Sequence, residues 1–316
     1  MQDIHILLFY KFVNLGNKEK LEEFRVKRLE ECEKIGLKGR ILVAEEGING
    51  SVSGTKEQID RYKKLMHSKK QFSDLWFKDD IGRALPFTKM TILVRDEIVA
   101  LKKKVDMSKA GNYLGPAQIL ELYGSDGKLK EGVVFLDARN DYEHKIGKFK
   151  DSIQVNTKTF REFPEKAKEL EKIKGIKDKK IVMYCTGGIR CEKASVVLKE
   201  AGFKDVNQIH GGVINFVQKY PDTFWEGKLF VFDKRMVADV NNENKEPITE
   251  CEVCSIPCDL YKNCRNPECD KFVVLCLDCQ FKLHGCCSQE CFLDFQKYSR
   301  KKSLVNQGRK TEAPIR

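Results

Sequence analysis

The first hundred residues alternate apolar runs with stretches whose apolar positions recur at helical spacing. Strand-like and helix-like segments follow one another in the order β-α-β-β-α-β, at residues 5–13, 18–36, 40–44, 50–53, 56–68 and 90–101. The two middle strands flank the turn Glu45-Glu-Gly-Ile-Asn-Gly50, which is typical of a hairpin. This order predicts an α+β domain of the ferredoxin-like (acylphosphatase-like) type over residues 1–105.

From residue 113 onward, helices and strands alternate one by one. The pattern predicts helix 116–123, strand 133–137, a helical region at 158–174, strand 180–185, helix 190–201 and strand 205–209. Such alternation favours a mainly parallel sheet with helices on both faces, because each crossover between parallel strands runs through a helix. We therefore expect a parallel-sheet α/β domain over residues 113–238.

Cysteine placement indicates a third module. The chain has 316 residues, enough for two or three domains of roughly 150 residues, and 13 cysteines. Ten of the cysteines lie within residues 251–291, so we place a cysteine-rich module at 248–296. The N-terminus has no small-residue cleavage site and is not typical of a secretory signal. A cytoplasmic location would keep the thiols reduced, which favours metal binding over disulfides.

Charge and composition narrow the class of protein. Hydrophobic residues make up 41% and charged residues 33% of the chain, and no apolar run approaches the roughly 18 residues of a membrane span. We therefore expect a soluble protein without a membrane partner. The net charge of +11 favours a polyanion such as RNA, although solvated charged faces explain it equally well. Much of it falls in a basic tail at 297–316, with seven Lys/Arg and one Glu.

Several residues are weaker candidates for contact with RNA or ligand. Trp76, Phe77 and Phe87 lie among basic residues and are candidates for stacking on bases, but such aromatics more often belong to a core. The densest basic segments are 102–104 and 300–302. His210 precedes two glycines near the expected sheet end and is a candidate for the border of a pocket.

A cysteine stands where the best ligand position of the α/β domain is expected. Cys185 ends a buried strand, and the carboxyl ends of parallel strands are where such sheets bind ligands. The backbone of Thr186, Gly187, Gly188 and Ile189 then forms a loop ahead of a helix, so its N–H groups and the helix start favour an anion, and Arg190 adds a full positive charge. We expect Cys185 to have a lowered pKa and to be the catalytic nucleophile, with Arg190 stabilising the anion.

The two other cysteines outside the cluster differ in the role we expect of them. Cys191, six residues after Cys185, is either a resolving thiol or only a small residue at a helix start. Cys32 stands alone on a helical stretch and is expected to be structural. A lone strand-end cysteine like Cys185 is commonly inert, and the Gly-Gly and Arg beside it are what favour reactivity here.

The ten clustered cysteines have the spacing of metal ligands. Cys251-x₂-Cys254 and Cys276-x₂-Cys279 are paired knuckles, and tetrahedral zinc needs four soft ligands. We predict one site from these four cysteines and a second from Cys264, Cys269, Cys287 and Cys291. Structural zinc is the expected ion, and an iron–sulfur cluster is the main alternative, because it also binds four thiolates.

Two sets of motifs carry resemblances to known families. Cys185-Thr-Gly-Gly-Ile-Arg190, with Leu136–Glu143 before it and His210-Gly-Gly after it, resembles a rhodanese domain, in which the loop cysteine carries a persulfide. Together with Ala44–Gly50, Phe230–Arg235 and the cysteine module, the chain closely resembles the UPF0176 (TrhO/YceA) family over roughly residues 4–295. That family is described as rhodanese-domain tRNA uridine(34) hydroxylases, which use oxygen to make 5-hydroxyuridine at the wobble position.

The resemblance implies the reaction and its partners. It implies tRNA as the partner and substrate, O2 as co-substrate and no DNA partner, while it identifies no electron donor and the residues indicate no oligomeric state. Two mechanisms fit the loop: the Cys185 thiolate adds to C6 of uracil, or an oxygenated Cys185 forms and Cys191 resolves it. The rival functions are a sulfurtransferase with a persulfide on Cys185 and a non-catalytic RNA- or protein-binding module.

Overall fold

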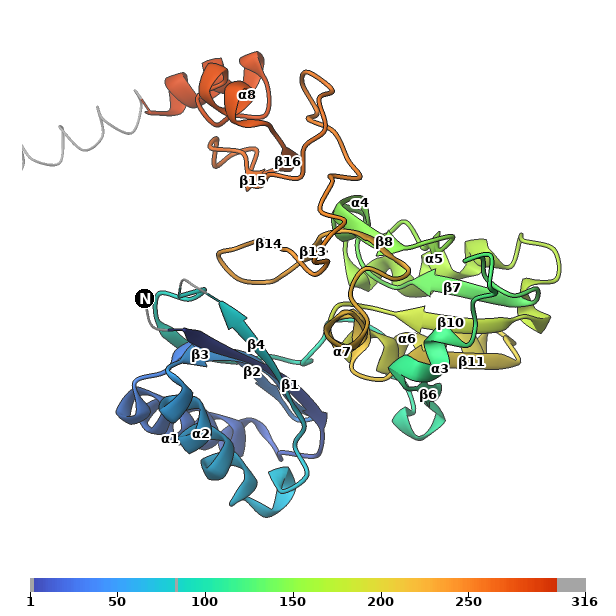
Figure 1. The fold of residues 1–316 in the computed structure, drawn as a ribbon. Coiled ribbons are helices and arrows are strands. Elements are labelled where there is room, and N and C mark those ends of the chain that lie inside the picture. The colour runs from blue at the N-terminus through green and yellow to red at the C-terminus, as the bar shows by residue number, and fades with distance from the viewer. Residues whose placement is uncertain (1–2, 83–84, 300–316) are drawn as a thin grey trace, which may run out of the picture.

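The N-terminal module is a five-stranded sheet covered on one face by two helices (Figure 1). The computed structural model describes residues 3–82 and 85–299. The strand order is β4-β1-β3-β2-β5, with β1 Ile4–Phe12, β2 Lys38–Ala44, β3 Gly47–Gly54, β4 Phe77–Gly82 and β5 Met90–Val94. The helices are α1, Lys18–Ile35, and α2, Lys56–His67.

Both helices of this module begin at side-chain caps. The Asn17 side chain accepts the backbone N–H of Lys20 at the start of α1, and Gly36 ends that helix in the left-handed conformation with φ 86°. Thr55 and Gln58 form a reciprocal capping box at the start of α2. These caps explain why the two helix boundaries lie close to the predicted ones.

The module departs from the predicted pattern at two places. The strand predicted within 90–101 is β5, an extra strand parallel to β2, whereas the last strand of the split βαβ unit is β4, which pairs antiparallel with β1. The polar sequence of β4 (FKDDIG) hid it, because this edge strand is only half covered. The hairpin turn is also shorter than predicted, since β3 already begins at Gly47.

The second module is built on a parallel sheet with helices on both faces. Its strand order is β6-β11-β10-β7-β9, with β6 Asn112–Leu114, β7 Val133–Asp137, β9 Ile153–Gln154, β10 Lys180–Tyr184 and β11 Asp205–Ile209. One face is covered by α5 Phe163–Leu170 and α6 Ile189–Glu200, and the other by α3 Pro116–Leu120 and α7 Gly212–Lys219. The predicted α/β class is confirmed, although α5 is much shorter than the predicted 158–174 region.

Short elements connect this sheet to the cysteine module. Next to the sheet lie α4 Asp141–Ile146, and the strand pairs β8 Gly147–Phe149 with β12 Trp225–Gly227 and β13 Leu229–Phe230 with β14 Val237–Ala238. The cysteine module contains β15 Tyr261–Asn263, β16 Phe272–Val274 and α8 Leu277–Lys282. It contacts α4, where the Tyr261 hydroxyl donates to the Tyr142 carbonyl at 2.8 Å and the Phe272 and Tyr142 rings stack.

Two of the sequence-based expectations concern membrane-spanning helices and the basic tail. No helix within the described ranges is both long and apolar enough to span a membrane. The predicted basic tail, 297–316, lies outside the described residues from position 300 on, and so does the basic segment 300–302.

The second module packs against the face of the N-terminal sheet that α1 and α2 leave uncovered. Because side chains alternate along a strand, Leu7 and Phe9 of β1 pack on the helices while Leu8 packs against the second module. Lys193 of α6 is almost fully buried at this interface, where it bonds to Glu46 at 2.9 Å and to Glu97 at 2.6 Å. Two motifs far apart in the sequence, Ala44–Gly50 and Cys185–Ser195, therefore meet.

Candidate active site and metal-binding cysteines

The Cys185 loop lies between the end of β10 and the start of α6. Cys185 is fully buried, and its Sγ accepts the backbone N–H of Gly188 at 3.1 Å. Gly188 has φ 99°, a left-handed conformation that glycine adopts without strain. A Cβ at Gly188 would also lie 3.0 Å from the Tyr10 hydroxyl of the N-terminal module. The loop is therefore shaped by its glycine and closely covered by the N-terminal module.

Cys185 is held in an environment that favours its thiolate. Burial opposes ionisation, but the thiol of Cys191, the charge of Arg190 and the backbone N–H groups of Arg190 and Cys191 outweigh it and lower the pKa of Cys185 to about 6. The thiolate is therefore the main form at neutral pH, as the loop sequence predicts.

The guanidinium of Arg190 is tied to a carboxylate that the sequence pattern did not point to. Its two terminal nitrogens donate to the Glu143 carboxylate at 2.5 and 2.7 Å, and both side chains are buried. The Thr186 hydroxyl donates to the same carboxylate at 3.0 Å. Glu143 lies on α4 in the Leu136–Glu143 stretch, but only the tertiary fold turns it toward Arg190. Arg190 thus acts on Cys185 from a fixed position.

Cys191 lies directly against Cys185 inside the core. It is fully buried, and burial together with the hydrogen bond to Cys185 raises the pKa of the Cys191 thiol well above its usual value. Cys191 therefore stays protonated and donates its S–H to the Cys185 thiolate. This geometry favours a hydrogen-bonding role over that of a resolving nucleophile, which has to ionise to react.

The N-terminal module contributes polar side chains around the loop that the sequence did not indicate. The Tyr10 hydroxyl donates at 2.8 Å to the buried carboxylate of Glu192 on α6, which also accepts from Tyr113 at 2.8 Å. The Lys78 ammonium donates to the Gly187 carbonyl at 2.8 Å. Tyr10 and Lys78 were hidden because each lies on a strand that also carries core residues, and the sequence does not show which of its side chains face the second module.

The aromatic candidates for base stacking lie in different environments. Trp76 stacks face to face on His210, with ring centroids 4.6 Å apart, and is partly exposed. Phe77 is buried in the N-terminal core, where it packs edge-on against Phe9. The more usual core role thus holds for Phe77, while Trp76 and His210 lie together at the junction between the modules.

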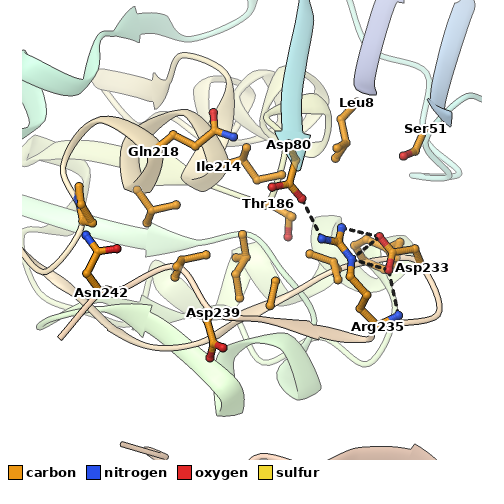
Figure 2. A pocket seen from close by; sticks show the side chains of 17 residues that line it. Leu8, Ser51, Asp80, Thr186, Ile214, Gln218, Asp233, Arg235, Asp239 and Asn242 are labelled. Carbon is orange, nitrogen blue, oxygen red and sulfur yellow. Dashed lines mark hydrogen bonds and ion pairs between the residues drawn. The ribbon is translucent and has the colours of Figure 1, made fainter. Parts of the chain in front are cut away.

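A pocket of about 360 Å³ opens beside Thr186, between the two modules (Figure 2). Asp80 comes from β4, and the segment around residues 229–242 provides much of the rest of the wall. Arg235 lies at one end, where it donates to Asp80 at 2.9 Å and to Asp233 at 2.7 Å, and Asn242 lies at the other (Figure 2). The size suits a ligand such as a nucleotide.

The ten clustered cysteines contain the two quartets expected from the spacing. The sulfurs of Cys251, Cys254, Cys276 and Cys279 all lie within 4.8 Å of one another, and so do those of Cys264, Cys269, Cys287 and Cys291. The quartets interleave along the chain, because each takes alternate pairs of cysteines. Of the remaining candidates, Cys258 and Cys286 are buried and His284 stacks on Phe292.

The chemistry of each quartet fits a cation among the sulfurs. Burial opposes ionisation of Cys251, but the N–H groups of Cys276, Cys254 and Val253 outweigh it and lower the pKa of Cys251 to about 6. Burial and hydrogen bonds with neighbouring thiols raise the pKa of Cys279 to about 12. Without a cation, one thiolate thus disfavours the next, whereas a divalent ion stabilises all four.

Comparisons with known proteins agree with this architecture. Models of three families match the chain in order: a UPF0176 acylphosphatase-like domain at residues 4–98, a rhodanese-like domain at 120–219 and a rhodanese C-terminal domain at 226–292. A protein of Cytophaga hutchinsonii named tRNA uridine(34) hydroxylase is 41% identical over 294 residues, 92% of this chain and 90% of the relative. This chain belongs to the same family.

Further relatives extend the family match. Proteins with the same name in Bacillus licheniformis and Enterococcus faecalis are 42% and 41% identical over 293 and 292 residues, which is 90% of this chain in both cases. The match to the UPF0176 family predicted from the motifs is therefore confirmed, as is the acylphosphatase-like and rhodanese-like fold. All eight cysteines of the two quartets fall within the matched 226–292 segment.

Proposed function

We propose that this protein is a tRNA-modifying oxidoreductase that uses O2 to hydroxylate C5 of the wobble uridine of tRNA. The observation that carries the proposal is the identity of about 41% to named tRNA uridine(34) hydroxylases over 92% of the chain. It favours hydroxylation over the sulfurtransferase alternative, which rests on the rhodanese-like domain alone. A tRNA substrate agrees with the net charge of +11 and favours a cytoplasmic location.

Cys185 is the nucleophile of the proposed reaction. Its thiolate adds to C6 of uracil, so that C5 becomes nucleophilic and accepts one oxygen atom derived from O2. Loss of the C5 proton and of the thiolate then releases the product. The other oxygen atom becomes water, with two electrons and two protons from an external donor. Arg190 and the Gly188 N–H stabilise the thiolate before addition and after release.

The pocket beside Thr186 is the proposed site for the flipped-out wobble nucleotide. Single-stranded anticodon bases can leave their stack and enter such a pocket, where polar side chains hydrogen-bond their edges. Asp80, Arg235 and Asn242 supply donors and acceptors there. Because Cys185 is fully buried, the base reaches its sulfur only after residues over the loop have moved.

The cysteine quartets are proposed to hold one structural zinc ion each. With Zn–S bonds of ~2.3 Å, a tetrahedral site places its sulfurs about 3.8 Å apart. The Cys254 and Cys276 sulfurs are 3.7 Å apart, and those of Cys269 and Cys287 are also 3.7 Å apart. A multi-iron cluster has to fit between its four thiolates and requires wider spacing, so the geometry favours a single ion. Bound zinc would cross-link the module and supply no redox chemistry.

The test is 5-hydroxyuridine in tRNA from cells that lack this gene and carry a plasmid copy. Wild-type protein is expected to restore the nucleoside, measured by mass spectrometry. Cys185→Ser is expected to leave it at the empty-vector level, whereas Cys32→Ala, a change at a buried cysteine of the N-terminal core, is expected to restore it. Undiminished 5-hydroxyuridine with Cys185→Ser would refute the role of Cys185.

The same strains separate the proposal from the sulfurtransferase alternative. If wild-type protein leaves 5-hydroxyuridine unchanged, while the purified protein carries a persulfide on Cys185 and releases thiocyanate with cyanide, sulfur transfer replaces hydroxylation as the function. Absence of both activities would favour the binding-module interpretation.

A further inference from the structure

One peptide group of the reactive loop is bound on both sides. The carbonyl of Gly187 and the N–H of Gly188 belong to the same planar peptide group and point in opposite directions. The carbonyl accepts the Lys78 ammonium at 2.8 Å, and the N–H donates to Cys185 Sγ at 3.1 Å. Lys78 comes from β4 of the N-terminal module, so this single peptide group links one module to the sulfur of the other.

The ammonium affects both the orientation and the strength of the hydrogen bond to sulfur. A peptide flip at Gly187–Gly188 would turn the carbonyl oxygen toward the Cys185 thiolate, which the ion–carbonyl bond to Lys78 prevents. A cation on the carbonyl also polarises the peptide group, so its N–H becomes a stronger donor. Both effects stabilise negative charge on Cys185.

Lys78 is held in an unusual way for a lysine. The residue is 4% exposed, and its ammonium bonds to a neutral carbonyl rather than to a carboxylate. The Tyr10 and Trp76 rings lie 4.7 and 4.9 Å from the ammonium, which places the cation against two aromatic faces. Burying a lysine in this way is unfavourable unless nearby negative charge compensates. The Cys185 thiolate and Glu192 provide that charge.

We propose that Lys78 is a positioning residue for the reactive loop: it holds the Gly187–Gly188 peptide group so that the Gly188 N–H faces Cys185, which couples activation of the thiol to docking of the N-terminal module. Lys78 acts through the peptide group rather than on the substrate. The inference concerns the state of Cys185 and is independent of which reaction the thiolate performs.

Several charged and titratable groups face Cys185 and have to be separated in the test. Arg190 and Cys191 approach it from α6, and Tyr10 and Lys78 approach it from the N-terminal module. Among them, Lys78 is the cation supplied by the other module. A change at Lys78 therefore removes the coupling between the modules and leaves Arg190 with its partner Glu143.

The experiment measures the pH dependence of Cys185 alkylation in the full-length protein. Iodoacetamide labelling of the Cys185 peptide is followed by mass spectrometry from pH 4.5 to 9. Because Cys185 is fully buried, the absolute rate also depends on opening of the loop, so the midpoint of the pH profile, which follows the thiolate fraction, is the quantity compared. Wild-type protein is expected to titrate near pH 6, and Lys78→Met is expected to raise this midpoint by about one pH unit. Lys78→Arg, which keeps the charge, is expected to stay closer to the wild type.

Lys63→Met is the matched control. Lys63 is a lysine of the same module that bonds to Asp79, the residue next to Lys78, at 2.6 Å, so the variant loses the same charge without touching the loop. Its Cys185 midpoint is expected to be unchanged. A folded Lys78→Met protein with the wild-type midpoint would overturn the proposal.

A second variant is used if Lys78→Met does not fold. If circular dichroism shows that Lys78→Met is unfolded, Lys78→Gln keeps a donor for the Gly187 carbonyl and removes only the charge. It is expected to raise the midpoint by less than one unit, and an unchanged midpoint would again refute the coupling. Because the readout is the acidity of Cys185 and not 5-hydroxyuridine, the proposal can fail while the hydroxylase function stands, and the reverse.

Discussion

The Cys185 loop and the cysteine module use the same atom in opposite ways. In the loop, one buried sulfur lies among a guanidinium, a thiol and backbone N–H groups, which lower its pKa to about 6. In the module, four sulfurs lie within 4.8 Å of one another, and each thiolate that forms disfavours the next. The loop thus stabilises one charge with groups of the protein itself, whereas each quartet is complete only with a cation.

This difference shows that the number of thiols at a site decides the chemistry less than the charges around them. A single thiolate with fixed positive neighbours remains available to react. Four thiolates around a divalent ion are held by coordination and become a structural cross-link. Because the quartets interleave along the chain, each site also fixes the loop that carries ligands of the other.

The largest effect is expected from removal of a metal ligand in the cysteine module. Cys254 is exposed, so Cys254→Ser removes a ligand with little effect on packing. We expect the variant to lose metal from both quartets, from two ions per chain to fewer than one, because the interleaved loops fold together. Elemental analysis by mass spectrometry measures the metal content.

Val253→Ser, at an exposed neighbour in the same knuckle, is the control and is expected to keep both ions. Loss of only one ion from Cys254→Ser would show that the two quartets bind metal independently. Two ions retained in that variant would rule out Cys254 as a ligand.

The second-largest effect is expected from disruption of the buried ion pair beside the Cys185 loop. Glu143→Gln removes the charge that balances buried Arg190, and disruption of a buried ion pair costs about 3–5 kcal/mol. Denaturant unfolding is expected to show this loss of stability, with metal content unchanged. Glu165→Gln makes the same substitution at an exposed pair with Lys168 and is expected to change stability by less than about 0.5 kcal/mol. Equal stability of the two variants would contradict the role assigned to Glu143.

The smallest effect is expected in the pH dependence of the hydroxylation rate. Cys185 has to lose a proton to react, so hydroxylation is expected to rise about tenfold per pH unit below pH 6 and to level off above it. Burial lowers the pKa of Lys78 to about 8, but loss of its charge raises the Cys185 midpoint by only about one unit, so Cys185 stays ionised and the rate is expected to remain level above pH 8. Initial rates on tRNA give the profile.

In Lys78→Met the acid limb of the rate profile is expected to move up by about one pH unit with the plateau kept, whereas in Lys78→Arg the guanidinium stays charged and the limb is expected to stay near the wild-type position. An acid limb of Lys78→Met at the wild-type position would contradict the role of Lys78. A rate that does not depend on pH between 4.5 and 7 would show that proton loss from Cys185 does not limit the reaction.

The local chemistry of the site could be predicted because it is written in consecutive residues. The strand end, two glycines and Arg190 follow Cys185 directly, and the backbone of one short loop brings them to one point. The first cysteine quartet was also predictable, because two C-x₂-C pairs are typical of soft-metal ligands, whereas the second was chosen from the cysteines that remained. The fold class followed from the order of apolar runs.

Other parts of the site depended on contacts that no local pattern records. Glu143 and Lys78 are ordinary charged residues in the sequence, and each becomes distinctive only because it is buried against the loop. β4 escaped prediction because an edge strand needs apolar residues on one side at most, and a polar run resembles a loop. For Phe77 the sequence left base stacking open beside the more usual core role, and the structure places its ring in the core.

By itself, the sequence determined where the chemistry lies: a thiol followed by a glycine loop and an arginine, and a cluster of ten cysteines rich enough for two sets of four metal ligands. Only the tertiary structure decided how the thiol is controlled. Hydrogen bonds and ion pairs act over a few ångströms, and the partners of this loop, Glu143 and Lys78, lie 47 and 109 residues along the chain from the residues they bond to. Folding brings them within 3 Å, and that proximity is what the order of residues does not express.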